Sequence, residues 1–479
     1  MSAPDQAPLT PDICVIGAGS GGLSVAAGAA AFGASVVLVE RGAMGGDCLN
    51  VGCVPSKAML AAAHRAQDMR EAKEFGLGAH EPQVDWRALN AHIHGIINAI
   101  APNDSVERFT ALGVHVIEAE ARFLDARTVE AGGVRIRARR FVLATGSAPL
   151  VPDIPGLDAV PFFTNETVFD NTRPIGHLLV IGGGAVGLEL AQAHRLLGAD
   201  VTVVTRGRAL GRQDPELSRF VLDRLRAEGV AIHENAQVLG VERRGKAGVR
   251  LTVDGEGGET RLDGTHLLVA AGRKPTSVPG LDAAGVKVGP DGIEVTLRLR
   301  TTNRRIYAVG DAVAGAPRFT HAANHHAGIV LRAILFRLPV RSDAKNIPRV
   351  LYTQPELAQV GLTEEEARKK VGPVNILRWP FSENDRAQAE RRIGGEIKIV
   401  CGKGGTVLGV GIAGARAGEL IGLWSMVVAQ GLKLSDVAGT VMPYPTLGEI
   451  GKRAAISYFS GTARAPWLRR LLGFLRFWG

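Results

Sequence analysis

A short pattern of apolar residues and glycines occurs twice in this chain and constrains its fold more than any other feature. In the first copy, the apolar run Ile13–Ile16 precedes Gly17-Ala-Gly19-Ser-Gly21-Gly22, small residues predict a helix over Leu23–Phe32, and a second apolar run covers Ser35–Val39. Glycine at these spacings permits a tight turn after a strand and lets the start of the helix approach a ligand closely. The pattern therefore predicts a strand–helix–strand unit of a parallel sheet.

The same pattern returns further along the chain. Two apolar runs, Leu178–Ile181 and Val201–Val204, flank a glycine motif that contains Gly182, Gly184 and Gly187. In such a unit the N-terminus of the helix binds the pyrophosphate of a dinucleotide. Two units imply two dinucleotides, with electrons passed from one to the other.

The residues that end the second strand differ between the two units. Glu40 ends this strand in the first unit, where a carboxylate can accept hydrogen bonds from ribose hydroxyls. Thr205 stands at the corresponding place in the second unit and is followed by Arg206 and Arg208. The lost negative charge and the added cations favour the 2′-phosphate of NADPH. If the arginines point into solvent instead, NADH remains the alternative.

Length and composition narrow the class of protein. At roughly 150 residues per domain, 479 residues indicate about three domains, and a hydrophobic content of 46% excludes a disordered chain. The net charge of +9 includes no run of five consecutive basic residues, so nucleic acid is not an expected partner. The segment before Ile13 has no basic region followed by an apolar stretch, which predicts a cytoplasmic protein.

The four cysteines are too few for a disulfide framework in a chain of this length, so any pair that matters is expected to be chemical. Cys48 and Cys53 form such a pair. In an undistorted helix, residues five apart have Cα atoms roughly 8.7 Å from each other, which is too far for a disulfide. A bridge would need a distorted turn, for which Gly52 provides freedom, and the strain would make the bond easier to reduce. Cys14 and Cys401 are interpreted as small core residues.

The segment Gly45–Lys57, GGDCLNVGCVPSK, resembles the redox-disulfide signature of the class I pyridine nucleotide-disulfide oxidoreductases. That family includes dihydrolipoamide dehydrogenase, glutathione reductase and mercuric reductase. Further family motifs follow in family order, and the resemblance extends from about Ile13 to Tyr458. They are Ala144–Ser147, Ala270–Pro275, Ile306–Asp311, Tyr352–Glu356 with Val360-Gly361, and Pro445–Glu449.

The resemblance implies an α/β fold with two Rossmann-type dinucleotide-binding domains and a C-terminal α+β dimerisation domain. The expected FAD-binding domain comprises residues 1–150 and 276–342, and the expected NAD(P)H-binding domain comprises residues 151–275. The dimerisation or interface domain is expected over residues 343–479, and the protein is expected to be a homodimer.

The resemblance also implies which residues bind the cofactors. Gly17, Gly19, Gly22 and Glu40 are expected to hold the adenosine half of FAD, and Asp311 its ribityl chain or pyrophosphate region. The nicotinamide dinucleotide is expected to contact Gly182, Gly184, Gly187, Arg206 and Arg208. The remaining expected cofactor-binding residues are Gly46, Lys57, Thr145, Gly146, Ser147 and Gly272. No resident metal ion is predicted.

The same resemblance assigns the catalytic residues. Cys48 is expected to be the outer thiol that exchanges with the acceptor, and Cys53 the inner thiol beside the flavin. Lys57 is expected to lie near the flavin and to pair with Glu189 of the second glycine motif, since a buried lysine needs a partner. Electrons are expected to pass from NADPH to FAD, then to the Cys48–Cys53 disulfide, then to the acceptor.

The chain departs from part of the family near its C-terminal end. Dihydrolipoamide dehydrogenase and glutathione reductase have a catalytic histidine before Pro-Thr in the last motif, whereas this chain has Tyr444, with Glu449 retained. A tyrosine with a pKa of about 10 is a poor proton acceptor at neutral pH compared with a histidine of about 6.5. Exchange with lipoamide or glutathione is therefore not favoured, and Tyr444 and Glu449 are the expected residues of this part of the site.

Mercuric reductase is similar in having tyrosine at that place. Two of its features are not seen here, a metal-binding domain with a CxxC motif before Ile13 and a cysteine pair at the C-terminus. The acceptors left open are a metal ion such as Hg(II) or Cu(II), a disulfide, and a quinone. The alternatives to a mercuric reductase-like enzyme are a dihydrolipoamide dehydrogenase-type disulfide reductase and a diaphorase or quinone reductase without cysteine cycling.

The last residues, 465–479, are predicted to form an amphipathic basic helix. Its apolar positions are Trp467, Leu468, Leu471, Leu472, Leu475 and Trp478, with Arg469, Arg470 and Arg476 beside them. Such a helix can lie on an anionic membrane, which would place the protein peripherally at the inner face of the membrane. A helix packed on the dimer is the alternative, because both arrangements bury the same apolar face.

Overall fold

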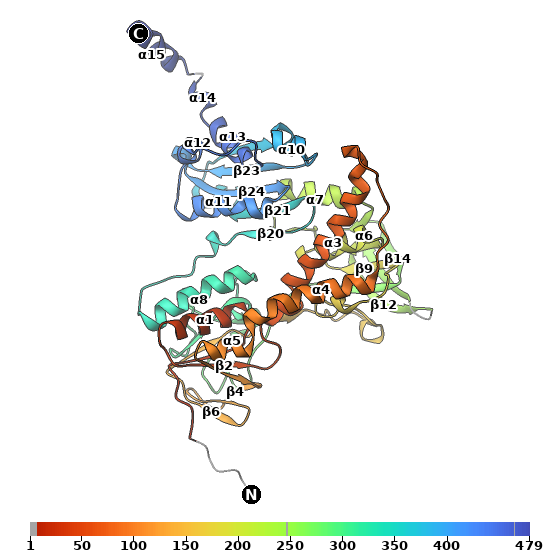
Figure 1. Cartoon of the computed structure of the whole chain (residues 1–479), viewed down its shortest axis with the longest axis vertical. Helices are drawn as coiled ribbons and strands as arrows, with labels where there is room; N and C mark the ends of the chain where they lie inside the picture. The colour runs from red at the N-terminus through yellow and green to blue at the C-terminus, as the bar shows by residue number, and fades with distance from the viewer. Residues whose placement is uncertain (1–6, 246–247, 464) are drawn as a thin grey trace. The chain divides into compact units, whose positions relative to one another are not determined.

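The computed structural model describes residues 7–245, 248–463 and 465–479 and divides the chain into two compact units. The first unit contains the chain up to Gly207 together with Ala231–Ala344, and the second contains Arg208–Val230 and Lys345–Gly479. Figure 1 shows both units and labels many of their helices and strands.

A parallel five-stranded sheet organises the first unit. Its order is β19-β7-β1-β2-β3, with bounds Ile306–Ala308, Arg140–Leu143, Ile13–Ile16, Val36–Glu40 and Val114–Glu118. The strands are short apolar runs, as expected where both faces of a parallel sheet are covered. Helices α1 (Ser20–Ala31) and α8 (Thr320–Leu335) lie side by side and pack with the sheet in one buried cluster.

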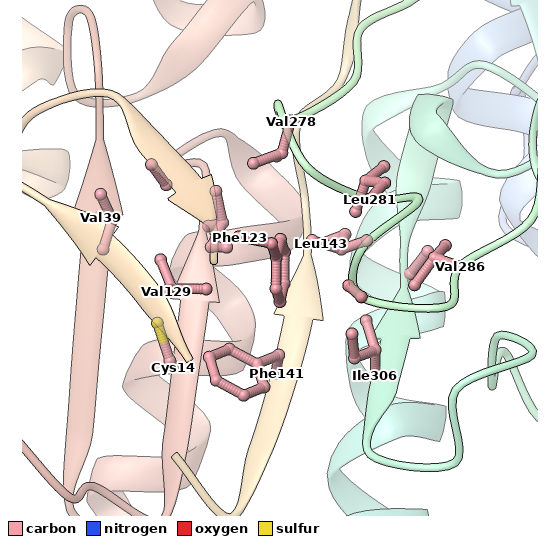
Figure 2. Close-up of a cluster of buried hydrophobic side chains, with 14 of the residues drawn as sticks. Cys14, Val39, Phe123, Val129, Phe141, Leu143, Val278, Leu281, Val286 and Ile306 are labelled. Atoms are coloured by element: carbon pink, nitrogen blue, oxygen red, sulfur yellow. The ribbon is translucent and has the colours of Figure 1, made fainter. Parts of the chain in front are cut away.

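Alternation along β1 divides the core into two clusters. Ile13 and Val15 belong to the cluster that includes α1 and α8, whereas Cys14 and Ile16 belong to a second cluster. Figure 2 shows the second cluster, in which Cys14 lies near Val129 and Phe141. It includes residues of a small antiparallel sheet of β4 (Ala121–Phe123), β5 (Val129–Ala131) and β6 (Val134–Ile136). Cys14 is thus a core residue, as the sequence predicts.

The second glycine motif lies in a second sheet, also within the first unit. Its order is β11-β10-β9-β15, with bounds Val230–His233, Asp200–Val204, His177–Ile181 and His266–Val269, and α6 (Ala185–Leu196) follows β9. An antiparallel sheet of β12 (Gln237–Arg244), β13 (Gly248–Gly255) and β14 (Gly258–Gly264) shares a core with it. Short pairs β8–β16 (Ser147–Pro149, Arg273–Pro275) and β17–β18 (Val288–Gly289, Gly292–Ile293) complete the strands of this unit.

The expected elements are present with small shifts at their ends. Helix α1 begins at Ser20 rather than Leu23, because its first turn includes the glycines of the motif. Between β2 and β3 the chain forms α2 (Gly46–Asn50), α3 (Cys53–Glu71), α4 (Trp86–Ile100) and α5 (Val106–Ala111).

The second unit is built on an antiparallel five-stranded sheet of order β20-β21-β24-β23-β22. The bounds are Arg349–Leu351, Glu356–Gly361, Val407–Gly414, Glu396–Cys401 and Asn375–Pro380. Its helices are α7 (Pro215–Ala227), α9 (Glu364–Val371), α10 (Asp385–Ala389), α11 (Ala417–Ala429), α12 (Leu434–Gly439), α13 (Glu449–Ser457), α14 (Ser460–Ala463) and α15 (Pro466–Leu475). Cys401 is buried in the core of this sheet, as the sequence predicts.

Helix α7 packs on β21 and β24 of this sheet, although its sequence lies between two strands of the nucleotide-binding region. Lys398 on β23 accounts for part of this packing, because its Nζ contacts Asp214 Oδ2 at 2.9 Å and Glu216 Oε2 at 2.8 Å at the start of α7. Among the described residues, none of the helices combines the length and apolar composition needed to cross a membrane.

Candidate redox site and dinucleotide cradles

Cys48 and Cys53 lie in different helices, so the turn between them is broken rather than distorted. Helix α2 ends at Asn50 and α3 begins at Cys53. Gly52 links them, and a Cβ at this position would lie 2.9 Å from the carbonyl oxygen of Asp47. Glycine is therefore required here because the backbone of Asp47 approaches closely. This steric reason differs from the sequence argument, which gave conformational freedom as the role of Gly52.

Each of the two cysteines changes the pKa of the other, and both residues are unbridged thiols in this structure. The hydrogen bond from Cys48, a contact of 3.4 Å to Thr320 Oγ1 and the charge of Lys57 together lower the pKa of the Cys53 thiol to about 6. The same hydrogen bond and burial raise the pKa of the Cys48 thiol. Cys53 also starts the long helix α3, whose N-terminal amides favour a negative charge. The thiolate is thus expected on Cys53 at neutral pH.

The ion pair between Lys57 and Glu189 is present. Lys57 Nζ lies 2.8 Å from Glu189 Oε2, with Glu189 on α6 nearly buried and Lys57 on α3 about one-third exposed. Lys57 lies one turn after Cys53 on α3, so its positive charge acts on the thiol of Cys53. The carboxylate of Glu189, on α6, holds the ammonium group of Lys57 in place. This confirms the pairing of the two residues, and the pair connects the cysteine helix with the helix of the second glycine motif.

Arg273 joins the cysteine turn to the loop of Asp311, and the sequence did not single it out. Its Nη2 lies 3.0 Å from Asp47 Oδ2, and its Nε donates to Ser147 Oγ at 2.7 Å. The hydroxyl of Ser147 in turn donates to Asp311 Oδ2 at 2.6 Å. Burial raises the pKa of Asp47, whereas the charge of Arg273 lowers it. The position of Arg273 in the Ala270–Pro275 motif was its only signal in the sequence.

The first glycine motif forms a cradle that suits the pyrophosphate of FAD. A side chain at Gly17 or Gly22 would collide with backbone atoms, whereas a Cβ at Gly19 would meet no atom within 4 Å. Gly19 caps α1 without any side-chain hydrogen bond, so the helix N-terminus faces an open position. Glu40 is fixed beside it, because its carboxylate accepts from the backbone N–H groups of Ala18 at 2.5 Å and Gly42 at 2.7 Å.

This cradle touches the turn that carries the cysteines. Gly45 N donates to Ala18 O at 3.0 Å, and a Cβ at Gly46 would lie 2.7 Å from Gly19 Cα. Thr145, Gly146 and Ser147 lead from β7 into β8, and Thr145 Oγ1 donates to the Thr276 carbonyl at 2.7 Å. The structure therefore brings Gly46, Ser147 and Asp311 into the same unit and network as the first glycine motif.

The second glycine motif has the same construction. Side chains at Gly182 and Gly187 would collide with the backbone, and Gly184 caps α6 with open space around it and no side-chain hydrogen bond. Gly272 has φ +134°, which only glycine adopts easily, and it precedes β16. Of the two arginines, Arg206 belongs to the first unit and Arg208 to the second.

Tyr444 lies in the second unit and is 68% exposed. Its hydroxyl donates to Asp385 Oδ2 at 2.7 Å, and this hydrogen bond with the negative charge of Asp385 raises the pKa of the phenol. Glu449 begins α13 and adds to the negative potential at Tyr444. Asp385 was not singled out from the sequence, because nothing in its neighbourhood along the chain points to position 444. The part of the chain that the structure describes contains no group of three or more His, Cys, Asp or Glu side chains suited to a metal ion.

The chain belongs to the pyridine nucleotide-disulphide oxidoreductase family, whose main domain matches residues 11–327 and whose dimerisation domain matches residues 347–455. A mercuric reductase from Streptomyces lividans is 36% identical over 463 residues, covering 95% of this chain and 97% of that protein. A dihydrolipoyl dehydrogenase from Bacillus subtilis is 34% identical over 463 residues, covering 94% of this chain and 96% of that protein.

A solved structure extends the likeness. The Cu(II) complex of the HOCl-induced flavoprotein disulfide reductase RclA from Escherichia coli matches with a TM-score of 0.82 at 25% identity, covering 92% of this chain and 98% of that one. These similarities confirm the expected family, the α/β fold with its dimerisation domain, and a flavin-dependent oxidoreductase that uses FAD and NAD(P)H. The dimerisation domain supports a homodimer.

Proposed function

We propose that this protein is an NADPH-dependent flavoprotein reductase that passes electrons through Cys48 and Cys53 to a soft metal ion, in the manner of a mercuric reductase. The observation that carries the proposal is the thiol pair, in which Cys53 is stabilised as a thiolate beside Lys57. Thiolates are the preferred ligands of soft cations such as Hg(II) and Cu(I). The names of the relatives, a mercuric reductase and a Cu(II)-bound disulfide reductase, support this class of acceptor.

Bound FAD would supply the two-electron chemistry that connects NADPH with the thiol pair. The chain would hold it through the first glycine cradle and Glu40, and Lys57 would lie near its ring, kept in place by Glu189. Two electrons and one proton delivered to a Cys48–Cys53 disulfide would break the S–S bond and leave one thiolate, on Cys53, and one thiol, on Cys48. Cys48 would be the sulfur that the acceptor reaches, because the flavin ring would cover Cys53, the more exposed of the two cysteines in this structure.

Tyr444 supports a metal ion over a disulfide as the acceptor. Thiol–disulfide exchange requires a group that takes and returns a proton near neutral pH. The pKa of Tyr444 is raised by Asp385, so the phenol keeps its proton and offers an O–H donor rather than a base. Metal binding by thiolates needs no such base.

Dihydrolipoamide dehydrogenase-type activity is the second candidate, because dihydrolipoyl dehydrogenases are as similar to this chain as mercuric reductases are. A diaphorase or quinone reductase that does not cycle its cysteines is the third. NADPH is proposed over NADH because of Arg206 and Arg208. We place the enzyme in the cytoplasm, where thiols stay reduced, with peripheral contact at the inner face of the membrane through residues 465–479.

The test is anaerobic NADPH consumption by purified holoenzyme with thiol-buffered Hg(II), Cu(II), oxidised lipoamide, oxidised glutathione or a soluble quinone. We expect turnover with the metal ions that is abolished by Cys48→Ala and retained by Cys401→Ala, which removes a buried thiol outside the site. Turnover with lipoamide would assign the disulfide reductase function instead. Turnover with quinone that survives Cys48→Ala would assign a diaphorase.

A further inference from the structure

Helix α15 places its apolar side chains on one side. Successive residues of an α-helix are separated by about 100° around the axis, and on this basis six apolar residues of α15 fall within an arc of about 160°. They are Trp467, Leu468, Leu471, Leu472, Phe474 and Leu475. The rest of the circumference carries Pro466, Gly473 and two arginines, Arg469 and Arg470, and Arg476 follows the last turn on the same side.

This apolar face is exposed. Trp467 is 60% exposed and Phe474 61%, and none of residues 465–479, all of which the structure describes, is buried. Soluble proteins rarely leave a contiguous apolar surface of this kind to water, so a surface that covers it is required. Phe477 and Trp478, beyond the helix, are exposed as well.

The charge around the helix indicates what that surface is. After Glu449 the sequence contains six basic residues and no acidic one. A second copy of the same segment would bring like charges together, and the family's dimerisation domain ends at residue 455, before α15 begins. An anionic lipid surface suits both the basic and the apolar side of α15. Its headgroups pair with arginine, and the boundary between headgroups and acyl chains accepts tryptophan, phenylalanine and leucine side chains.

We propose that α15 lies flat on a membrane surface and recognises anionic lipid headgroups through Arg469, Arg470 and Arg476. The six apolar side chains enter the boundary between headgroups and acyl chains, and the three arginines stay at headgroup level. This deepens the peripheral contact proposed above by naming the lipid chemistry, and it is independent of the electron acceptor.

The experiment is co-sedimentation of the full-length holoenzyme with vesicles of phosphatidylcholine alone or of phosphatidylcholine with phosphatidylglycerol. We expect binding to the anionic vesicles only, weakened by added salt. Replacing the three arginines by Gln should weaken binding about 100-fold, since each basic residue near an anionic surface contributes about fivefold. The matched control replaces Arg122, Arg127 and Arg304, exposed arginines of the first unit, by Gln and should bind like the wild type.

Deletion of residues 465–479 tests the helix as a whole. We expect the truncated protein to lose vesicle binding while its dimeric state and its turnover in solution stay those of the full chain. Equal binding to both kinds of vesicle, or binding that survives the deletion, would overturn the proposal. A truncated protein that sediments as a monomer would show that α15 covers a second copy of the chain instead. Vesicle binding needs no turnover, so these outcomes do not depend on the proposed reductase activity.

Discussion

The ionisation of Cys53 governs what the redox site can do at a given pH. Its thiol has a pKa lowered to about 6 by the hydrogen bond from Cys48, by Thr320 and by Lys57. A lowered pKa means that the thiolate is present above about pH 6 and is lost as the pH falls below it. The site therefore keeps its nucleophilic sulfur through the neutral range.

This gives a prediction for the reduced protein. Alkylation of Cys53 by iodoacetamide should proceed at a constant rate above about pH 7 and fall about tenfold per pH unit below about pH 5. Mass spectrometry of the Cys53 peptide measures the rate, and Cys53→Ser provides the blank. A midpoint near the ordinary value for a cysteine would contradict the interaction with Cys48 and Lys57.

Asp47 opposes the groups that lower the pKa of Cys53, since its negative charge raises that pKa. Asp47→Asn removes that charge and leaves the Arg273 guanidinium next to the cysteine turn with Asp311, 3.8 Å from its Nε, as its remaining ion-pair partner. Both effects favour the thiolate, so the alkylation midpoint should move to lower pH. Asp291→Asn, which alters an exposed carboxylate elsewhere in the first unit, should leave the midpoint unchanged. A rise in the Asp47→Asn protein would mean that Arg273 moves away with its partner.

At the scale of elements, Lys398 helps to attach α7 to the antiparallel sheet of the second unit. This residue of β23 is only 5% exposed and contacts three carboxylates, from Asp214, Glu216 and Glu364, at 2.8 to 3.0 Å. Asp214 also caps α7, since its side chain accepts from the N–H groups of Glu216 and Leu217. One lysine thus neutralises the start of one helix and the first turn of another, α9.

Lys398→Met should therefore destabilise the second unit by about 3–5 kcal/mol, because the buried carboxylate of Asp214 loses its lysine partner, whereas Glu216 and Glu364 keep Arg378 and Arg368. Denaturant unfolding measures the loss, and Lys403→Met, at an exposed lysine, is the control. In the wild type, Arg378 and Lys398 lower the pKa of Glu216 to about 2. Its contribution to stability is therefore present at neutral pH and is lost as the pH falls from about 4 towards 2. The Met variant should keep the part of this acid sensitivity that Arg378 supplies and lose the part due to Lys398, so its stability should fall less between about pH 4 and pH 2. A variant as acid-sensitive as the wild type would contradict the role of Lys398.

The glycine motifs, the strands beside them and the Lys57–Glu189 pair could be predicted, because each depends on a local pattern or on a motif of known spacing. The packing of α7 on the sheet of the second unit could not be predicted. The ion pairs that attach it to β23 join Asp214 and Glu216 to Lys398, far along the chain, and a charged residue carries no local sign of its partner. The same holds for Arg273 with Asp47 and for Tyr444 with Asp385.

At the scale of the whole molecule, the dimerisation domain carries Tyr444, and we propose that Tyr444 of one subunit completes the site around Cys48 of the other. We expect Cys48→Ala and Tyr444→Phe each to reduce metal-dependent turnover strongly. Subunits of the two variants, unfolded together and refolded, should regain about a quarter of the wild-type rate, because half of the dimers are mixed and each mixed dimer has one intact site. The refolded single variants are the controls. No recovery in the mixture would place Tyr444 outside the partner's site.

The contact between the first glycine cradle and the cysteine turn also bears on how the protein matures. Gly19 and Gly46 touch backbone to backbone, and Gly45 is hydrogen-bonded to Ala18. A ligand that binds only the folded cradle stabilises the cradle and the segment that packs against it, which here is the cysteine turn. We therefore expect Cys48 and Cys53 to reach their final arrangement only when FAD binds. A cell that lacks the riboflavin needed to make FAD would then contain an inactive apoprotein rather than a protein with reactive thiols.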